Sequence, residues 1–157
     1  MTKVIKDNQR EEEANLLEVE DLKKYFPIRR GLFRRTAGYV RAVDGVSLQI
    51  GRGRTLGLVG ETGSGKTTLG RAILRLIPAD SGRVCFEGED ILTLSGRRMR
   101  ELRRRMQIIF QDPYGSLNPR MRVGEIVGEG IKNFGRMNRR EIRDRVGELL
   151  ETVGLAP

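Results

Sequence analysis

A glycine-rich loop is the part of this sequence whose residue types and spacing could do chemistry. It is a complete G-x-x-x-x-G-K-[ST] pattern, made of Gly60, Glu61, Thr62, Gly63, Ser64, Gly65, Lys66 and Thr67. Glycines let the backbone wrap closely enough for successive N–H groups to point at phosphate oxygens. The pattern directs the Lys66 ammonium to the β- and γ-phosphates and the Thr67 hydroxyl to Mg²⁺. The loop therefore predicts a site for a nucleotide and its Mg²⁺.

The residues on either side of the loop fit this interpretation. Residues 55–59 form a short apolar run, which predicts a buried strand that enters the loop. Thr68 continues the phosphate site into a helix whose apolar residues recur at i, i+3, i+4 and i+7, namely Leu69, Ala72, Ile73 and Leu76. We expect this helix to run to Ile77, to stop at Pro78 and to direct the positive end of its dipole at the phosphates.

The charge of the chain raises the question of nucleic acid. The 157 residues carry a formal net charge of +9, and arginines cluster over residues 29–35 and 97–105. Aromatic residues make up 5% of the chain and Trp is absent, so few platforms for stacking bases are evident. We interpret the arginines as solvated faces or contacts to partner surfaces and expect no nucleic-acid partner.

Cysteine and histidine usage excludes several kinds of site. Cys85 is the single cysteine, which excludes an intrachain disulfide, and its apolar neighbours predict a core position. Histidine is absent, which excludes His acid–base chemistry and makes a structural zinc site unexpected. Residues 1–15 are mostly polar and predict a disordered leader. No stretch approaches the ~18 apolar residues that span a bilayer.

Alternation and helical periodicity predict the remaining elements. Strands are expected over residues 16–20, 39–43, 46–50, 83–87 and 108–110. Asp44 and Gly45 form a strong hairpin-turn signal between the second and third of these strands.

Three further helices are expected. Ser95 predicts the N-cap of a helix with an apolar stripe of Met99, Leu102 and Met106. Apolar spacing predicts a helix over residues 123–134, weakened by Gly128 and Gly130. Asn138 and Glu141 resemble a capping box for a last helix that ends at Gly154.

Two stretches outside the loop carry a resemblance to a known family. The run from Gln111 to Met121, which reads QDPYGSLNPRM, is similar to the segment after the Q-loop in ATP-binding subunits of ABC transporters. The similarity is to the oligopeptide, dipeptide and nickel importer branch of that family. Residues 22–31 look like the extended N-terminal loop of the same branch, and the loop at 60–67 matches its Walker A motif.

The resemblance implies roles for individual residues. It implies ATP and Mg²⁺ as ligands, with Lys66 and Gln111 as the catalytic residues. Gln111 resembles the glutamine that reaches Mg²⁺ and the attacking water. Phe26 falls where the family places an aromatic ring that stacks on adenine, and the adjacent Tyr25 could serve instead. Either ring could also simply cover the edge of a sheet.

The resemblance also implies a fold and an extent. We expect an α/β fold in which residues 16–112 form a P-loop NTPase core with an antiparallel β portion. Residues 113–157 would begin an ABC-type helical subdomain. The family's LSGGQ signature, Walker B aspartate, following glutamate and switch histidine are not found in these residues. We therefore expect a chain truncated before the signature motif, marginally stable by itself, that binds nucleotide weakly and does not hydrolyse it.

Function and partners follow from the same resemblance. It implies an ABC-type ATPase that couples ATP binding and hydrolysis to the uptake of peptides or related small solutes. The implied partners are membrane-spanning permease subunits, a second ATP-binding subunit and, indirectly, a solute-binding protein. The implied place is the cytoplasmic face of the cell membrane. Two alternatives stay open: another P-loop enzyme, although no N-K-x-D guanine motif is present, and a nucleic-acid-associated module suggested by charge alone.

Overall fold

The computed structural model describes residues 15–31, 35–112, 115, 117–135 and 137–156. It divides into two compact units, Met1–Met106 and Gln107–Pro157. This division falls somewhat before the domain boundary expected at residue 113, which stays a prediction. The expected leader lies outside the described residues except for Asn15, which begins the first strand.

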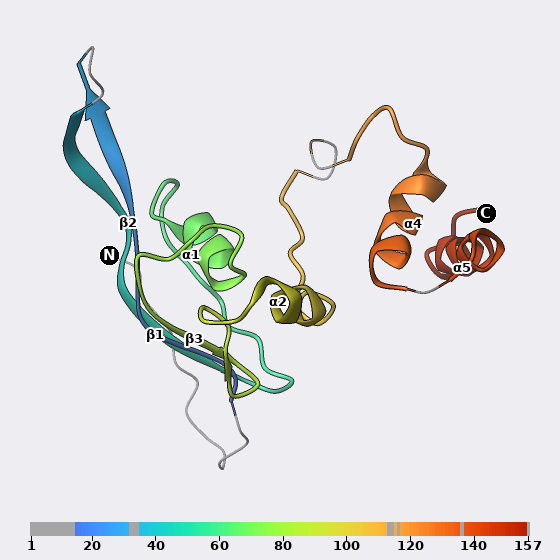
Figure 1. Ribbon diagram of the computed structural model, residues 1–157, viewed down its shortest axis with the longest axis horizontal. Helices are drawn as coiled ribbons and strands as arrows, with labels where there is room; N and C mark the ends of the chain where they lie inside the picture. The colour runs from blue at the N-terminus through green and yellow to red at the C-terminus, as the bar shows by residue number, and fades with distance from the viewer. Residues whose placement is uncertain (1–14, 32–34, 113–114, 116, 136, 157) are drawn as a thin grey trace. The chain divides into compact units, whose positions relative to one another are not determined.

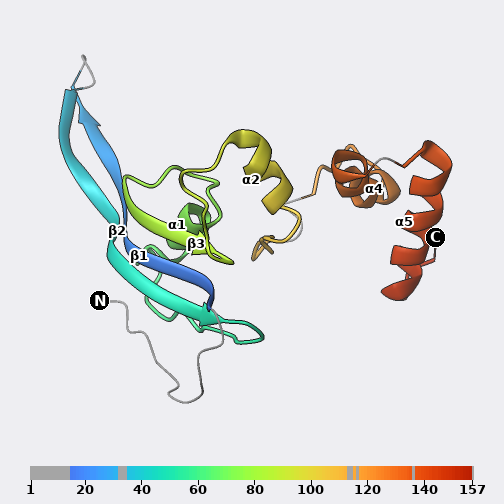
Figure 2. The ribbon, with the colours of Figure 1, turned by 60° about the horizontal axis from the view of Figure 1, so that its bottom comes forward.

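A four-stranded antiparallel sheet forms the base of the first unit (Figure 1). Its strands follow the order β2-β1-β3-β4, and their bounds are β1 (Asn15–Arg30), β2 (Arg35–Gly51), β3 (Ser81–Phe86) and β4 (Glu89–Asp90). The pairing of β1 with β3 ends at Lys23 and Ser81. Beyond that point β1 and β2 continue as a two-stranded arm, which extends past β3 in both views (Figures 1 and 2). We call residues 24–30 and 35–43 the arm.

The hairpin turn expected at Asp44 and Gly45 is wrong. These residues lie inside β2, which pairs with β1 on both sides of them. Gly45 has a φ of +71°, and the pairing register shifts at this level of the sheet. The left-handed glycine therefore accommodates a bulge instead of reversing the chain. The reversal comes between Arg30 and Arg35, which pair with each other at the end of the arm.

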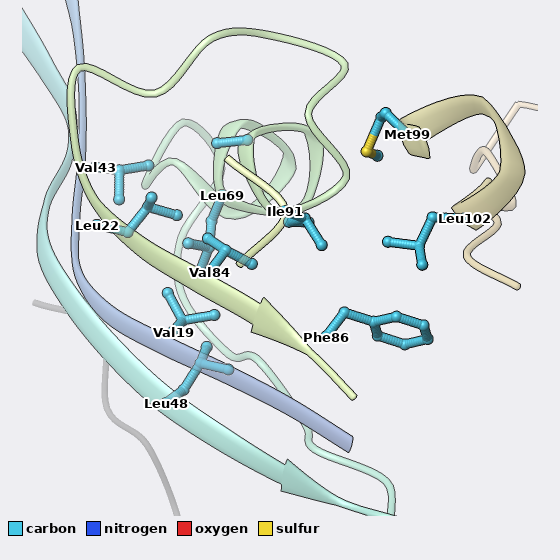
Figure 3. Close-up of a cluster of buried hydrophobic side chains, with 11 residues drawn as sticks. Val19, Leu22, Val43, Leu48, Leu69, Val84, Phe86, Ile91, Met99 and Leu102 are labelled. Atoms are coloured by element: carbon cyan, nitrogen blue, oxygen red, sulfur yellow. The ribbon is translucent and has the colours of Figure 1, made fainter. Parts of the chain in front are cut away.

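The core lies between the inner face of the sheet and two short helices (Figure 3). The helices are α1 (Lys66–Ile73) and α2 (Gly96–Leu102). The buried cluster consists of Val19, Leu22, Val43, Leu48, Leu69, Ala72, Val84, Phe86, Ile91, Met99 and Leu102. Full burial of a side chain of the Val, Leu or Phe class contributes about 1.5–3 kcal/mol each. This contact fixes α1, and with it the start of α1, against β1 and β2.

Several local expectations are confirmed in this unit. Ser95 is the N-cap of α2, and its hydroxyl accepts the Arg98 amide hydrogen at 3.4 Å. Met99 and Leu102 are buried, and Met106 packs partly against the core. Cys85 is also buried, and burial raises the pKa of its thiol.

Helix α1 ends earlier than expected, at Ile73. Arg75 adopts a left-handed backbone with φ +51°, which ends the helical path before Pro78. Its guanidinium Nη1 donates to the carbonyl oxygens of Ile91 at 3.1 Å and Leu94 at 2.7 Å. These bonds tie the end of α1 to the segment that leads into α2.

Two expected strands are not formed by the described residues. In the run 55–59 only Val59 takes part in an isolated bridge, although Leu56 and Leu58 pack against the core. Residues 108–110 have no strand assignment, and Ile109 is 96% exposed. A strand exists through the ladder it shares with a neighbour. The apolar composition of 108–110 predicted burial that the pairing in this structure does not provide.

Helices α4 (Val123–Phe134) and α5 (Arg139–Thr152) of the second unit pack against each other. The expected capping box is confirmed, because Asn138 Oδ1 accepts the Glu141 amide at 3.0 Å and Glu141 Oε2 accepts the Asn138 amide at 2.7 Å. Gly154 follows the C-cap with φ +77°. Among the described residues, no helix is long and apolar enough to cross a membrane.

Gly128 weakens α4 by its low helix propensity, but it also has a role in packing. It is buried, and a Cβ at this position would lie 3.3 Å from Ile142 Cγ2 and 3.5 Å from Val146 Cγ2. Gly130, on the same helix, is exposed, and a Cβ there would meet no atom within 4 Å. The glycine at 128 therefore lets α5 approach α4 closely.

We predict that Gly128→Gln and Gly130→Gln change the stability of this helix pair in opposite directions. Gly130→Gln should stabilise it by about 0.5 kcal/mol through helix propensity. Gly128→Gln should destabilise it by about 1–3 kcal/mol because the larger side chain overpacks the contact. Hydrogen exchange of residues 139–152 measures both effects, and equal protection in the two variants would contradict the prediction.

Candidate functional site

The glycine-rich loop leads directly into α1. Gly65 is the N-cap of the helix with φ +93°, and Lys66 is its first residue. The Leu69 amide donates to the Gly65 carbonyl at 2.8 Å, so the amides of residues 66–68 precede the first helical hydrogen bond. The helix has no side-chain cap and no acidic residue in its first turn. Its positive end is therefore open to an anion.

The Lys66 ammonium lies within the loop. It donates to the carbonyl oxygens of Gly60 at 2.7 Å and Glu61 at 2.6 Å, and to Ser64 Oγ at 3.3 Å. The Ser64 amide donates to the Glu61 carbonyl at 3.2 Å, which closes a turn inside the loop. The loop therefore folds around the ammonium group of the first residue of α1.

The loop lies directly against β2. A Cβ on Gly65 would come within 2.0 Å of the Ala42 carbonyl oxygen, a distance that no side chain can occupy. Ala42 is an extra residue in β2, because Val43 pairs with Lys24 while Arg41 pairs with Tyr25. The bulge at Ala42 therefore coincides with the close approach of the loop.

The donor set of this loop fits a nucleotide phosphate chain with its cation. Backbone amides at a helix start and a lysine ammonium are phosphate donors, and glycines leave room for the backbone to reach the oxygens. The Thr67 hydroxyl lies exposed in the first turn and offers the hard oxygen that Mg²⁺ prefers. Thr68 follows it, half-buried, in the same turn.

Tyr25 and Phe26 lie on β1 at the base of the arm, opposite Arg41 and Val40. Successive strand residues point to opposite faces of a sheet, so only one of the two rings can share a face with the loop. The Tyr25 hydroxyl donates to Asp44, which raises the pKa of Tyr25 and lowers that of Asp44. The Arg41 guanidinium lies 5.7 Å from the centre of the Tyr25 ring. Tyr25 is thus engaged on its own face of the sheet.

Phe26 lies on the other face. Phe26 is 41% exposed, and the Lys24 ammonium lies 5.4 Å from the centre of the Phe26 ring. Lys24 pairs with Val43, a member of the buried core beneath α1, so Phe26 continues the face that carries the loop. This geometry favours Phe26 over Tyr25 for contact with a ligand of the loop, although both roles stay predictions.

Sequence reasoning did not find the contribution of Asp80. Its carboxylate accepts the Tyr25 amide hydrogen at 2.5 Å and a hydrogen bond from the Lys24 ammonium at 3.2 Å. These bonds, the backbone bond first, hold the pKa of Asp80 below its usual value. The available signal was Lys24, a charged residue in the same alternation as the buried Leu22.

Gln111 lies exposed in the second unit, whereas the loop belongs to the first. Its role toward Mg²⁺ therefore stays a prediction. Within the run from Gln111 to Met121, residues 113, 114 and 116 lie outside the described residues.

The arginine cluster around α2 is extensively paired. Arg98 forms hydrogen bonds to Glu89 at 2.9 and 3.0 Å and to Glu101 at 3.1 Å. Arg105 pairs with Glu87, which also accepts from Arg52 at 2.7 Å. These pairs neutralise part of the cluster locally, and the interpretation of the arginines as solvated faces or contacts to partner surfaces stays a prediction.

Comparison with known proteins decides the family. Residues 43–157 match the family described as ABC transporter. The chain belongs to this family. Over 90% of its length it is 51% identical to the peptidoglycan transport ATP-binding protein YejF of Agrobacterium fabrum, and it covers 26% of that protein. It is 47% identical over 92% of its length to the oligopeptide transport ATP-binding protein AppF of Bacillus subtilis, and it covers 44% of that relative.

Solved ABC structures share the fold. The ATP-binding cassette MJ0796, in a dimeric post-hydrolysis state bound to ADP and Pi, matches with a TM-score of 0.65 at 24% identity. That match covers 86% of this chain and 56% of the cassette. The cbiO1 protein of Clostridium perfringens, part of an ABC transporter complex, matches with a TM-score of 0.60 at 27% identity. This second match covers 90% of this chain and 51% of the cbiO1 chain. The expected α/β cassette fold is confirmed, and the chain spans less than half the length of its curated relatives.

We predict that two glycines of this ABC chain differ in their tolerance of alanine. Gly63 and Gly65 both have left-handed backbones, with φ of +85° and +93°, but a Cβ on Gly63 would meet no atom within 4 Å. Gly63→Ala should cost about 1–2 kcal/mol of left-handed strain. Gly65→Ala should cost more, because the loop must also move away from the Ala42 carbonyl. Urea unfolding of both variants measures the difference, and equal losses would contradict the close contact.

We predict that Asp80 makes folding sensitive to acid. Because folding lowers the pKa of Asp80, its stabilising contribution is complete above the unfolded pKa of about 3.9 and is lost as the pH falls through the folded pKa. Asp80→Asn should be less stable than the parent chain at pH 7, and the gap should close as the pH falls below about 4. Thermal unfolding between pH 7 and pH 3 tests this, and a gap that is constant with pH would exclude the ionised carboxylate as the cause.

Proposed function

We propose that this chain binds MgATP through residues 60–68 and forms part of the ATP-binding subunit of an ABC importer for peptides or related small solutes. The observation that supports MgATP binding is the start of α1, which has no side-chain cap. The Lys66 ammonium lies within the adjoining loop, and Gly65 packs directly against the Ala42 carbonyl. Membership of the ABC transporter family and the names of the relatives support the second part of the proposal.

The individual residues have distinct parts in this proposal. The amides of the loop and of the first turn of α1 bind the phosphate oxygens, and Lys66 neutralises their charge. Thr67 supplies an oxygen ligand to Mg²⁺. A role for Gln111 toward Mg²⁺ is implied by the family resemblance alone. Phe26 offers a stacking surface to the adenine ring, while Tyr25 holds the arm through Asp44. Bound MgATP supplies the phosphoanhydride bond whose hydrolysis drives transport.

The partners and the place of action are also part of the proposal. They are membrane-spanning permease subunits, a second ATP-binding subunit and, indirectly, a solute-binding protein, at the cytoplasmic face of the membrane. Nucleic acid is not among them. We further infer that these 157 residues turn ATP over negligibly, because the water-activating and signature residues implied by the family resemblance are not among them.

Titration calorimetry with MgATP tests the binding function. Lys66→Ala should lower the affinity at least about tenfold, because a charge-assisted contact to the phosphates is lost. Lys132→Ala removes an exposed cation from α4 and should leave the affinity unchanged. Equal affinity of the parent chain and Lys66→Ala would overturn the proposed site. Steady ATP turnover by the parent chain that Lys66→Ala abolishes would overturn the inference of negligible hydrolysis.

A further inference from the structure

Lys24 is a buried cation at the point where the sheet narrows. Among the residues that the structure describes, it is the charged residue that is buried, with 8% of its surface exposed. Burial of an ammonium is unfavourable unless partners compensate for the lost water. The partners of Lys24 are the Asp80 carboxylate at 3.2 Å and the face of the Phe26 ring, whose centre is 5.4 Å away.

Asp80 holds this cation from a fixed position. It directly precedes β3, and its own amide donates to the Lys23 carbonyl at 2.9 Å. Its second carboxylate oxygen accepts the Tyr25 amide hydrogen. Asp80 therefore fastens β1 on both sides of Lys24, where β3 stops pairing and only the arm continues.

Phe26 lies on the arm side of that point. The residues nearest to it on the same face are Val40, its direct partner on β2, and Ile28, two positions along β1; both are also partly exposed, at 53% and 40%. A two-stranded ribbon by itself is marginally stable. The contact between the Lys24 ammonium and the Phe26 ring therefore connects Phe26 to the four-stranded part of the sheet.

The loop is close to the same part of β2. Val40 lies two residues before Ala42, whose carbonyl oxygen meets Gly65. A nucleotide whose phosphates bind at residues 60–68 would therefore extend its base toward this region of the arm.

We propose that Lys24, held by Asp80, is a positioning residue for the base of the nucleotide. It fixes the Phe26 ring so that a purine stacks on the ring while the phosphates bind the loop. A cation against one face of an aromatic ring is attracted to it, and the attraction is stronger when water is excluded. This inference rests on the proposed function and adds to it a residue that touches neither phosphates nor base.

Comparison of MgATP with magnesium tripolyphosphate tests the proposal, because tripolyphosphate carries the phosphates without the base. Titration calorimetry gives both affinities for the parent chain, Lys24→Met, Lys24→Arg and Phe26→Ala. Lys23→Met is the matched control, since Lys23 is the neighbouring lysine and pairs with Asp21 at 3.0 Å. Circular dichroism verifies that each variant is folded.

The expected result is a loss confined to the base. Lys24→Met should bind MgATP roughly threefold to tenfold more weakly and tripolyphosphate equally well, as expected for removal of a partly desolvated cation–π contact. Lys24→Arg should restore most of the MgATP affinity, because arginine retains both the ion pair and the ring contact. Lys23→Met should change neither affinity.

The other outcomes overturn the proposal in distinguishable ways. Equal weakening of both ligands in Lys24→Met would show a general structural role, and an unchanged MgATP affinity would show no role. If Phe26→Ala keeps the ratio of the two affinities, the base binds elsewhere, and the inference fails while the phosphate site stands. If the parent chain binds neither ligand, the proposed function itself fails.

Discussion

The contact between Gly65 and the Ala42 carbonyl is the constraint on which the site depends. A backbone meets a backbone there with no room for a Cβ, so the start of α1 is placed by main-chain atoms and not by adaptable side chains. Burial of the hydrophobic cluster beneath α1 stabilises this contact between the loop and β2. The extra residue at Ala42 provides the carbonyl that the loop meets. The position of the phosphate loop thus follows from the register of β1 with β2.

Local signals in the sequence predicted the elements that local interactions form. The cap at Ser95, the capping box of Asn138 and Glu141, and the buried positions Leu69 and Met99 all follow from periodicity and short-range hydrogen bonds. The glycine-rich loop was evident because its glycines, lysine and threonine occur at the spacing that phosphate binding requires.

The failures concern residues whose state depends on distant parts of the chain. Asp44 and Gly45 carry a turn signal, but pairing with β1 on both sides makes them a bulge. Residues 108–110 are apolar enough for a buried strand, yet a ladder needs a neighbour, and Ile109 is left in solvent. Lys24 and Asp80 are 56 positions apart, so no local pattern could pair them.

The internal bonds of Lys66 bear on the heat of ligand binding. Its ammonium already has two carbonyl oxygens and a hydroxyl as acceptors, so a phosphate would exchange these contacts instead of adding to unmet ones. The enthalpy gained from the new ion pair is then offset by the enthalpy of the bonds given up. Since the loop is already gathered around the cation, little conformational entropy remains to be lost. The contribution of Lys66 to affinity is therefore the difference between its phosphate contacts and the loop contacts that they replace.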